Sequence, residues 1–269
     1  MSNRQLMPVV FVPHGGGPMP LLGDPSHREL TQFMQQLASG LPQPKAILVV
    51  TAHWEEGTAH VSSATNPSMI YDYNGFPPES YEFRYAAPGD PALAQQVVQL
   101  LNDRRIPAML DNQRGFDHGT FVPLLLSYPK AVVPVVQLSL LSSLDPAEHI
   151  AIGRALAPLR EQGVLILGSG MSFHNMRAFF SPSPVVKAKS ETFDKWLNET
   201  LTSAALDDAE RAQRLVNWMH APEARFSHPR EEHLLPLHVC FGAALATPKA
   251  QRNFGSELLG TRVSGFIWQ

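Results

Sequence analysis

Short apolar runs alternate with segments of helical character along this chain of 269 residues. The runs at residues 9–12, 47–50 and 164–167 have the length and composition of buried β-strands. Strands that alternate with helices are typical of a central sheet covered by helices. We therefore predict one α/β domain over residues 1–269, with a mostly parallel or mixed central sheet and helices on both faces.

The bounds of further helices and strands follow from the periodicity of apolar residues and from capping residues. Asp90-Pro91 and Asp145-Pro146 each place an N-cap before a proline, which is typical of a helix start. Pro134 lacks a backbone N–H, so we expect its strand to lie at an edge or to bulge. Strands are also expected at residues 45–50, 132–140 and 262–268. Helices are expected at residues 24–37, 91–101, 120–128, 145–160, 185–201, 208–219 and 232–245.

Composition argues against several classes of partner. A formal net charge of −3, without a long Lys/Arg run, disfavours nucleic acid and anionic membranes. Residues 1–7 lack the pattern of a signal peptide, and no apolar stretch approaches a membrane span, so we expect a cytoplasmic protein. The single cysteine, Cys240, excludes an internal disulfide and a cysteine-rich zinc site, and its apolar helical setting predicts burial. The sequence is compatible with a homo-oligomer.

Four histidines lie at the ends of predicted elements. His14, His53 and His174 follow apolar runs by two to seven residues, and His233 stands at a predicted helix start. The carboxyl ends of the strands line the ligand crevice of an open α/β sheet, so imidazoles delivered there can converge on one point. Neutral imidazole is a common ligand of iron and zinc. This pattern predicts a metal site made by histidines.

The other histidines differ in their settings. His118 stands between Asp117 and Gly119 just before a predicted helix, a position that suits acid–base work or hydrogen bonding to an anionic oxygen. The remaining six are expected to have structural roles: His27, His60, His149 and His220 in polar or surface-like settings, His228 in a loop, and His238 in packing.

The segment from residue 69 to residue 85 has no clear periodicity but is rich in aromatic side chains. It is either a loop packed on its own aromatics or an aromatic wall over a flat, apolar substrate. Both interpretations stay open, and they are compatible. The aromatic residues are Tyr71, Tyr73, Phe76, Tyr81, Phe83 and Tyr85.

A hydrolase offers an alternative interpretation. His14 and the three glycines after it look like the oxyanion-hole segment of lipases, and Gly170-Met171-Ser172 begins like a nucleophile elbow. The elbow needs a second glycine two residues after the serine, where this chain has His174. An esterase that uses Ser172 would also leave His53 and His118 without a role, so this alternative is the weaker one.

Taken in order, the motifs resemble those of the class III extradiol ring-cleavage dioxygenases, in particular the 4,5-DOPA dioxygenase group. The resemblance runs through the whole chain. One departure is the run Gly15-Gly16-Gly17-Pro18, where relatives often have Gly-Ser-Pro. The motifs that carry the resemblance include Pro13-His14-Gly15, Ala52-His53-Trp54, Gly115-Phe116-Asp117-His118-Gly119, His174-Asn175 and Glu232-His233-Leu234-Leu235-Pro236-Leu237.

This resemblance implies a set of roles. His14, His53 and His233 would bind the metal, and His174 would be a fourth ligand or an acid–base residue. His118 would contact the substrate or bound oxygen. Glu232 adjoins His233, but on a helix it would point about 100° away, so we prefer His233 as the ligand.

The resemblance also implies the reaction. The cofactor would be Fe(II), with Zn(II) able to occupy the same ligands, and the substrates would be a small aromatic diol (a catechol) and O₂. The product would be a muconic semialdehyde. Arg84 and Arg177 are the candidates for binding a substrate carboxylate. A non-enzymatic, Memo-like binding protein of the same kind of fold is the other alternative.

Overall fold

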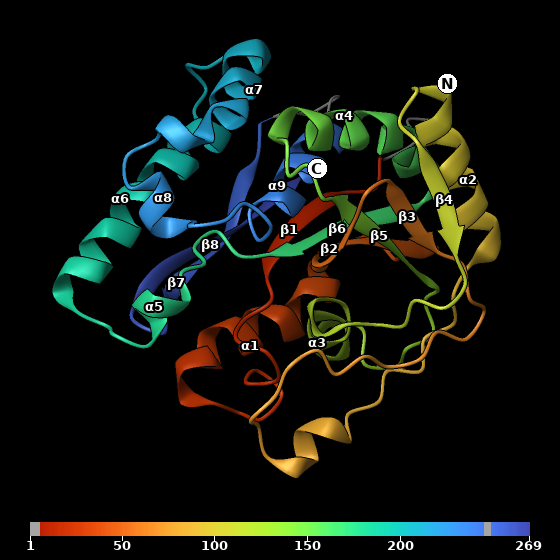
Figure 1. Ribbon diagram of the computed structural model, residues 1–269, viewed down its shortest axis with the longest axis horizontal. Helices are drawn as coiled ribbons and strands as arrows, with labels where there is room; N and C mark the ends of the chain where they lie inside the picture. The colour runs from red at the N-terminus through yellow and green to blue at the C-terminus, as the bar shows by residue number, and fades with distance from the viewer. Residues whose placement is uncertain (1–5, 245–248) are drawn as a thin grey trace.

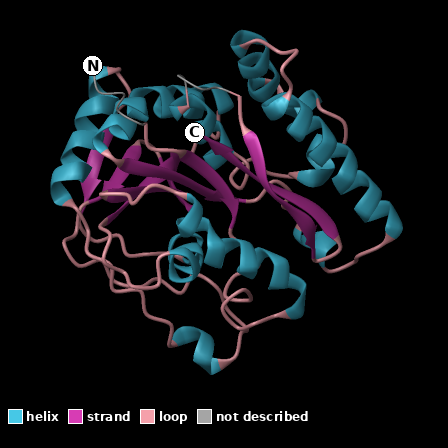
Figure 2. Ribbon diagram, turned by 180° about the vertical axis from the view of Figure 1, so that it is seen from behind, coloured by secondary structure: helices cyan, strands magenta, loops and turns pink. Residues whose placement is uncertain are grey.

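The computed structural model describes residues 6–244 and 249–269, and its centre is a mixed sheet with helices on both faces (Figures 1 and 2). The strands are β1 (Val9–Pro13), β2 (Ala46–Glu56), β3 (Ala59–Ser62), β4 (Ala108–Asp111), β5 (Val135–Leu141), β6 (Val164–Gly170), β7 (Gln251–Leu258) and β8 (Thr261–Trp268). Their order across the sheet is β4-β3-β5-β2-β6-β1-β8-β7.

The four central strands, β5, β2, β6 and β1, run parallel, so their carboxyl ends meet at one edge of the sheet. Antiparallel pairs stand on either side, where β3 meets β5 and where β8 pairs with both β1 and β7. This arrangement confirms the predicted α/β fold with a mixed sheet.

Two apolar cores lie on the two faces of the sheet. Alternate residues of β2 divide between them: Leu48 and Val50 enter one core, whereas Ile47 and Val49 enter the other. The helices are α1 (Arg28–Leu37), α2 (Pro91–Asp103), α3 (His118–Ser127), α4 (Pro146–Leu156), α5 (Met176–Phe179), α6 (Pro184–Thr202), α7 (Asp208–Val216), α8 (Ala224–Ser227) and α9 (Leu235–Ala243). Helices α2, α4 and α9 cover the first core, and α1 and α3 cover the second (Figure 1). Short 3₁₀ helices stand at Pro25–His27, Ala38–Gly40, Pro78–Tyr81, Ala157–Gln162 and Trp218–His220.

The predicted caps are present. Asp90 accepts a hydrogen bond from the backbone N–H of Leu93, and Asp145 accepts from those of Ala147 and Glu148. Each carboxylate thus satisfies N–H groups that the first turn of a helix leaves without a backbone partner.

The expectation for Pro134 is wrong. Strand β5 begins at the next residue, Val135, and lies between β2 and β3 instead of at an edge. The missing N–H is therefore no loss to the sheet, and the carbonyl of Pro134 accepts a hydrogen bond from the N–H of Ile47.

Several boundaries also differ from the prediction. Strand β2 continues six residues beyond residue 50, to Glu56, and therefore contains His53. The helix expected at residues 232–245 begins only at Leu235, and residue 245 lies outside the described residues. Cys240 is buried in α9, as predicted. Within residues 6–244 and 249–269, no helix has both the length and the hydropathy needed to cross a membrane.

Candidate metal centre

Three histidines converge at the carboxyl edge of the central strands. His14 follows β1, and His53 lies near the end of β2, where the pairing with β5 shifts register between Val50 and Glu55. Such a bulge re-aims side chains. His233 arrives from the turn before α9. The nitrogens of these three rings that could bind a metal lie within 4.8 Å of one another.

The geometry of the three rings fits a metal. The Nε2 atoms of His14 and His53 are 3.2 Å apart. Nε2 of His233 is buried and has no hydrogen-bond partner among the described residues. Because an unpaired buried nitrogen is costly, a ligand for it is expected. A metal ion at the point of convergence would satisfy all three nitrogens.

The opposite nitrogen of each ring faces an oxygen. Nδ1 of His14 donates to the carbonyl oxygen of Gly15 at 2.9 Å, and Nδ1 of His233 donates to Oε1 of Glu232 at 2.9 Å. Nδ1 of His53 lies 3.4 Å from Oδ2 of Asp72. An acceptor at Nδ1 keeps the proton there and leaves the lone pair of Nε2 free for a metal.

Burial keeps the three imidazoles neutral. Desolvation lowers the pKa of His14, His53 and His233 well below the ordinary value, and the charges of neighbouring histidines lower each of these pKa values further. The nearby carboxylate of Asp72 opposes the shift at His53 without reversing it. Metal ligation requires the neutral form of imidazole, so the centre is ready for a metal near neutral pH.

Close packing fixes the backbone beside His14. Gly15 has a φ of +87°, and a Cβ there would lie 2.8 Å from Pro20 and 2.9 Å from His27. The N–H of Gly16 donates to Nε2 of His27 at 3.0 Å. His27 is thus fully buried, and the expected surface-like setting was wrong for it.

The expected surface-like setting is also wrong for His149. It is fully buried, its Nε2 accepts from the N–H of Leu141, and its Nδ1 donates to the carbonyl of Asp145. His60 is half-buried and His220 is exposed. His228 follows α8 and is buried, and His238 packs inside α9, as expected.

An arginine that the sequence did not single out holds the backbone at His53. Arg114 donates to the carbonyl of His53 at 3.0 Å and to Oδ2 of Asp117 at 2.8 Å, and its guanidinium lies 4.9 Å from the ring centre of Trp54. Asp117 also accepts from the hydroxyl of Thr51 at 2.8 Å and caps α3. Arg114 and Asp117 thereby link the strand that carries His53 to the start of the helix that carries His118.

His118 is the first residue of α3, and its ring centre lies 3.9 Å from that of His53. Its backbone N–H and its Nδ1 both donate to Oδ1 of Asp72, at 2.9 and 2.8 Å. Burial alone would raise the pKa of Asp72, but the hydrogen bond and the charges of His118 and His53 lower it to about 2. Asp72 is therefore a carboxylate at neutral pH.

Asp72 belongs to the aromatic segment, which packs against this side of the centre. The ring of Tyr73 lies 5.9 Å from that of His118 and 5.4 Å from that of Tyr81. Burial, with smaller effects of Tyr71 and Tyr81, raises the pKa of Tyr73 to about 12. The segment is thus a loop packed on its own aromatics, one of which also faces a histidine of the centre.

The ring of His174 stacks on that of His233. The two ring centres are 3.4 Å apart, with an angle of 11° between the planes. Nδ1 of His174 lies 3.6 Å from Oε1 of Glu232. Burial first, and then the charge of His118, lowers the pKa of His174 to about 4. His174 therefore shares a carboxylate with His233. The donor atoms of His174, Glu232 and His233 converge as closely as those of His14, His53 and His233, and so do those of His53, Asp72 and His118.

The expectation that Glu232 points away from His233 is wrong. Residues 231–234 form a turn before α9, so the 100° rotation of a helix does not apply. The turn lies against the end of β6, where the N–H of Met171 donates to the carbonyl of His233. A Cβ at Gly170 would stand 2.2 Å from that carbonyl oxygen, so only glycine permits the approach.

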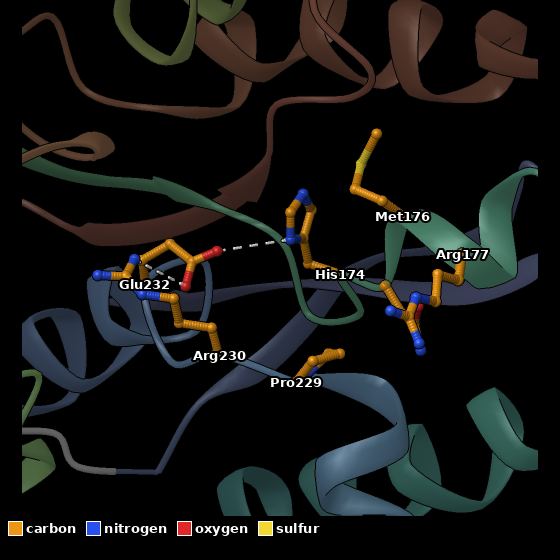
Figure 3. Close-up of a pocket in the computed structure, with 7 residues that line it drawn as sticks. His174, Met176, Arg177, Pro229, Arg230 and Glu232 are labelled. Carbon is orange, nitrogen blue, oxygen red and sulfur yellow. Dashed lines mark hydrogen bonds and ion pairs between the residues drawn. The ribbon is translucent and has the colours of Figure 1, made fainter.

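A pocket of about 470 Å³ opens beside His174 (Figure 3). Arg177 lines this pocket, whereas Arg84 is exposed on the aromatic segment and donates to the carbonyls of Tyr81 and Phe83. The lining residues are His174, Asn175, Met176, Arg177, Pro229, Arg230 and Glu232.

The environment of Ser172 does not support the hydrolase alternative. The side chain is buried, and its hydroxyl oxygen accepts a hydrogen bond from the backbone N–H of Ser264 at 2.7 Å. Nε2 of His228 donates to the backbone carbonyl of Ser172 instead of pairing with the hydroxyl. A nucleophile needs an adjacent base to activate it.

Three neutral histidines at the carboxyl edge of the α/β sheet offer the nitrogen donors that a non-haem metal centre requires. Residues 8–266 match a family model described as the catalytic LigB subunit of aromatic ring-opening dioxygenase. The chain therefore belongs to the LigB family of ring-opening dioxygenases, whose members depend on a non-haem metal.

Curated relatives agree with this assignment. The dioxygenase tasH of Hapsidospora irregularis is 38% identical and covers 99% of this chain and 87% of its own length. The 4,5-DOPA dioxygenase extradiol of Beta vulgaris is 39% identical, with 93% of this chain and 91% of that protein covered. The protein of the same name from Escherichia coli K12 is also 39% identical, over 90% of this chain and 87% of its own.

A solved structure shares the fold. A crystal structure of an uncharacterized protein from Escherichia coli K12 has a TM-score of 0.79 and 33% sequence identity, over 98% of this chain and all of that one. The family and its named relatives identify this protein as an extradiol ring-opening dioxygenase, and they confirm the resemblance drawn from the sequence. They give no support to the esterase or to the Memo-like binding protein.

Proposed function

We propose that this dioxygenase opens the ring of a catechol beside its two hydroxyl groups and yields a muconic semialdehyde, with His14, His53 and His233 as the ligands of Fe(II). The observation that carries this proposal is the convergence of three imidazoles, two buried and that of His53 half-buried, whose Nδ1 atoms each face an oxygen. When bound, Fe(II) supplies the electron exchange between a catecholate and O₂, for which Zn(II) has no redox chemistry.

The ligand set favours an anionic substrate. The three imidazoles are neutral, so the ligands themselves add no negative charge to offset the positive charge of a bound metal. Partly buried charges interact more strongly than charges in water. A catechol that has lost a proton therefore binds better than a neutral one, and two adjacent oxygens suit the positions that three ligands leave open.

The ring of His118 contacts that of His53, and the ring of His174 contacts that of His233, so both are placed to handle protons at the centre. Nδ1 of His118 donates to Asp72, which leaves the lone pair at Nε2. His174 has a pKa of about 4 and is neutral near pH 7, so it too can accept a proton. One of them takes the proton of the catechol hydroxyl, and the other, once that proton has been passed to it, assists ring opening as an acid. The aromatic segment beside His118, with Tyr73 nearest, forms a wall for a flat ring.

A screen of catechols tests this function. Protein purified without oxygen and loaded with Fe(II) should convert 4-substituted catechols into yellow products that absorb from the near-ultraviolet to the visible. DOPA belongs in the screen because relatives are named for it. Ser172→Ala should leave this rate largely unchanged, since its hydroxyl pairs with a backbone N–H. Aryl esterase activity that this substitution abolishes, without turnover of catechols, would contradict the proposal.

A further inference from the structure

Two carboxylates stand behind the candidate metal centre, and each lies between two imidazoles. Oε1 of Glu232 is 2.9 Å from Nδ1 of His233 and 3.6 Å from Nδ1 of His174. Asp72 lies 2.8 Å from Nδ1 of His118 through Oδ1 and 3.4 Å from Nδ1 of His53 through Oδ2. Each carboxylate is thus shared between one proposed ligand and one proposed proton-handling residue.

Both carboxylates are themselves held in place. Arg230 lies 3.2 Å from Oε2 of Glu232 (Figure 3). It also binds both oxygens of Glu55, on β2, at 2.5 and 2.6 Å. Asp72 receives the backbone N–H at the start of α3. Glu232 is therefore tied to the strand that carries His53, and Asp72 to the helix that carries His118.

We propose that Glu232 and Asp72 are positioning residues, each of which orients a metal ligand and a proton-handling histidine together. The inference rests on the proposed function for the roles of the four histidines. A carboxylate only accepts hydrogen bonds, so it draws the proton of each neighbouring imidazole to Nδ1. Both Nε2 atoms then present lone pairs toward the centre. At Nδ1 of His14 the carbonyl oxygen of Gly15 takes the place of a carboxylate.

This arrangement makes retention of the metal and placement of the proton acceptors depend on the same two side chains. Loss of one carboxylate disturbs one pair of histidines and leaves the other pair intact. Glu232 would act on His174 and His233, and Asp72 on His53 and His118. A general structural defect would instead affect both pairs of histidines in either variant.

The tautomers of the histidines provide a test that needs neither metal nor turnover. Long-range ¹H–¹⁵N NMR spectra of the metal-free protein should show all four paired histidines with the proton at Nδ1. In Glu232→Ala, which removes the acceptor altogether, His174 and His233 should lose that fixed tautomer while His53 and His118 keep it, and Asp72→Ala should give the reverse. Spectra in which neither variant changes its own pair would overturn the proposal.

Metal affinity provides a second readout. Chelator competition with Zn(II) should show binding weakened about 10- to 100-fold in Glu232→Gln and in Asp72→Asn, which is the usual effect of losing a group that orients a ligand. The matched control is Glu231→Gln, because Glu231 stands in the same turn but pairs with Arg225. Its affinity should equal that of the unmodified protein.

The outcomes separate this inference from the proposed function. An unchanged affinity in both variants would overturn the inference, and so would complete loss of metal in Glu232→Gln, since Glu232 would then be a ligand itself. Should Glu232→Gln fail to fold, the metal affinity of Asp72→Asn still tests the inference. Failure of the iron-loaded protein to open any catechol would count against the proposed function alone, because the tautomers and the affinity are measured without substrate.

Discussion

Replacing His53 with alanine should remove the bound metal and abolish ring opening. His53 supplies one of three convergent nitrogens, and its Nε2 lies 3.2 Å from that of His14. Loss of a group that only orients a ligand weakens metal binding about 10- to 100-fold, and loss of a ligand should cost more. The fold should survive, because His53 is partly buried and belongs to neither apolar core.

Metal content of the purified protein, together with a thermal melt, checks this prediction. The matched control is His220→Ala, which removes an exposed imidazole from the end of the Trp218–His220 helix and should leave metal and activity unchanged. Undiminished metal in the His53→Ala protein would contradict the ligand assignment. His14→Ala and His233→Ala should behave as His53→Ala does.

His118→Ala and His174→Ala should slow the chemical step by roughly 10²- to 10⁴-fold while the metal is retained, if the two residues act as acid and base. Neither ring belongs to the group of His14, His53 and His233, so their removal leaves the proposed ligands in place. Single-turnover rates of the iron-loaded variants, measured beside their metal content, separate the two effects. Loss of metal in His174→Ala would make His174 a fourth ligand, and an unchanged rate in either variant would remove that residue from proton transfer.

The pattern of apolar residues along the sequence was enough to predict much of the fold. The runs at residues 47–50 and 164–167 are apolar because both faces of the central strands are covered, and such runs stand out in a sequence. Strand β4 was missed because it is short and lies at the edge of the sheet, with Met109 and Leu110 exposed. Strand β7 was missed because it is the opposite edge, where alternating polar residues face solvent.

The candidate site could be predicted only in part. Histidines that directly follow predicted parallel strands can be recognised in the sequence as candidate ligands, because the carboxyl ends of such strands meet at one edge of the sheet. Asp72 gave no such signal, since it reaches His118 across 46 residues from an irregular segment. Glu232 was misplaced because its direction depends on whether α9 starts before or after it, and helix starts are uncertain by a few residues.

Buried histidines with structural roles could not be told from exposed ones by the sequence alone. His27 and His149 stand among polar neighbours, yet both rings are buried. His27 pairs with the N–H of Gly16 and the carboxylate of Asp24, and His149 pairs with two backbone groups. Local composition reports the neighbours along the chain, whereas burial depends on segments brought in from elsewhere. His27, for example, is held by the glycine loop beside His14.

Oxygen consumption tests the central claim most directly. Metal-free protein loaded with Fe(II) or with Zn(II) would be mixed with the same 4-substituted catechol in an oxygen electrode, with metal occupancy measured on each sample. The iron form should consume one O₂ for each catechol opened, and the zinc form should bind the catechol without consuming oxygen, because Zn(II) has no redox chemistry. An iron form that has full occupancy yet consumes no O₂ with any of a broad set of catechols would contradict the proposed function.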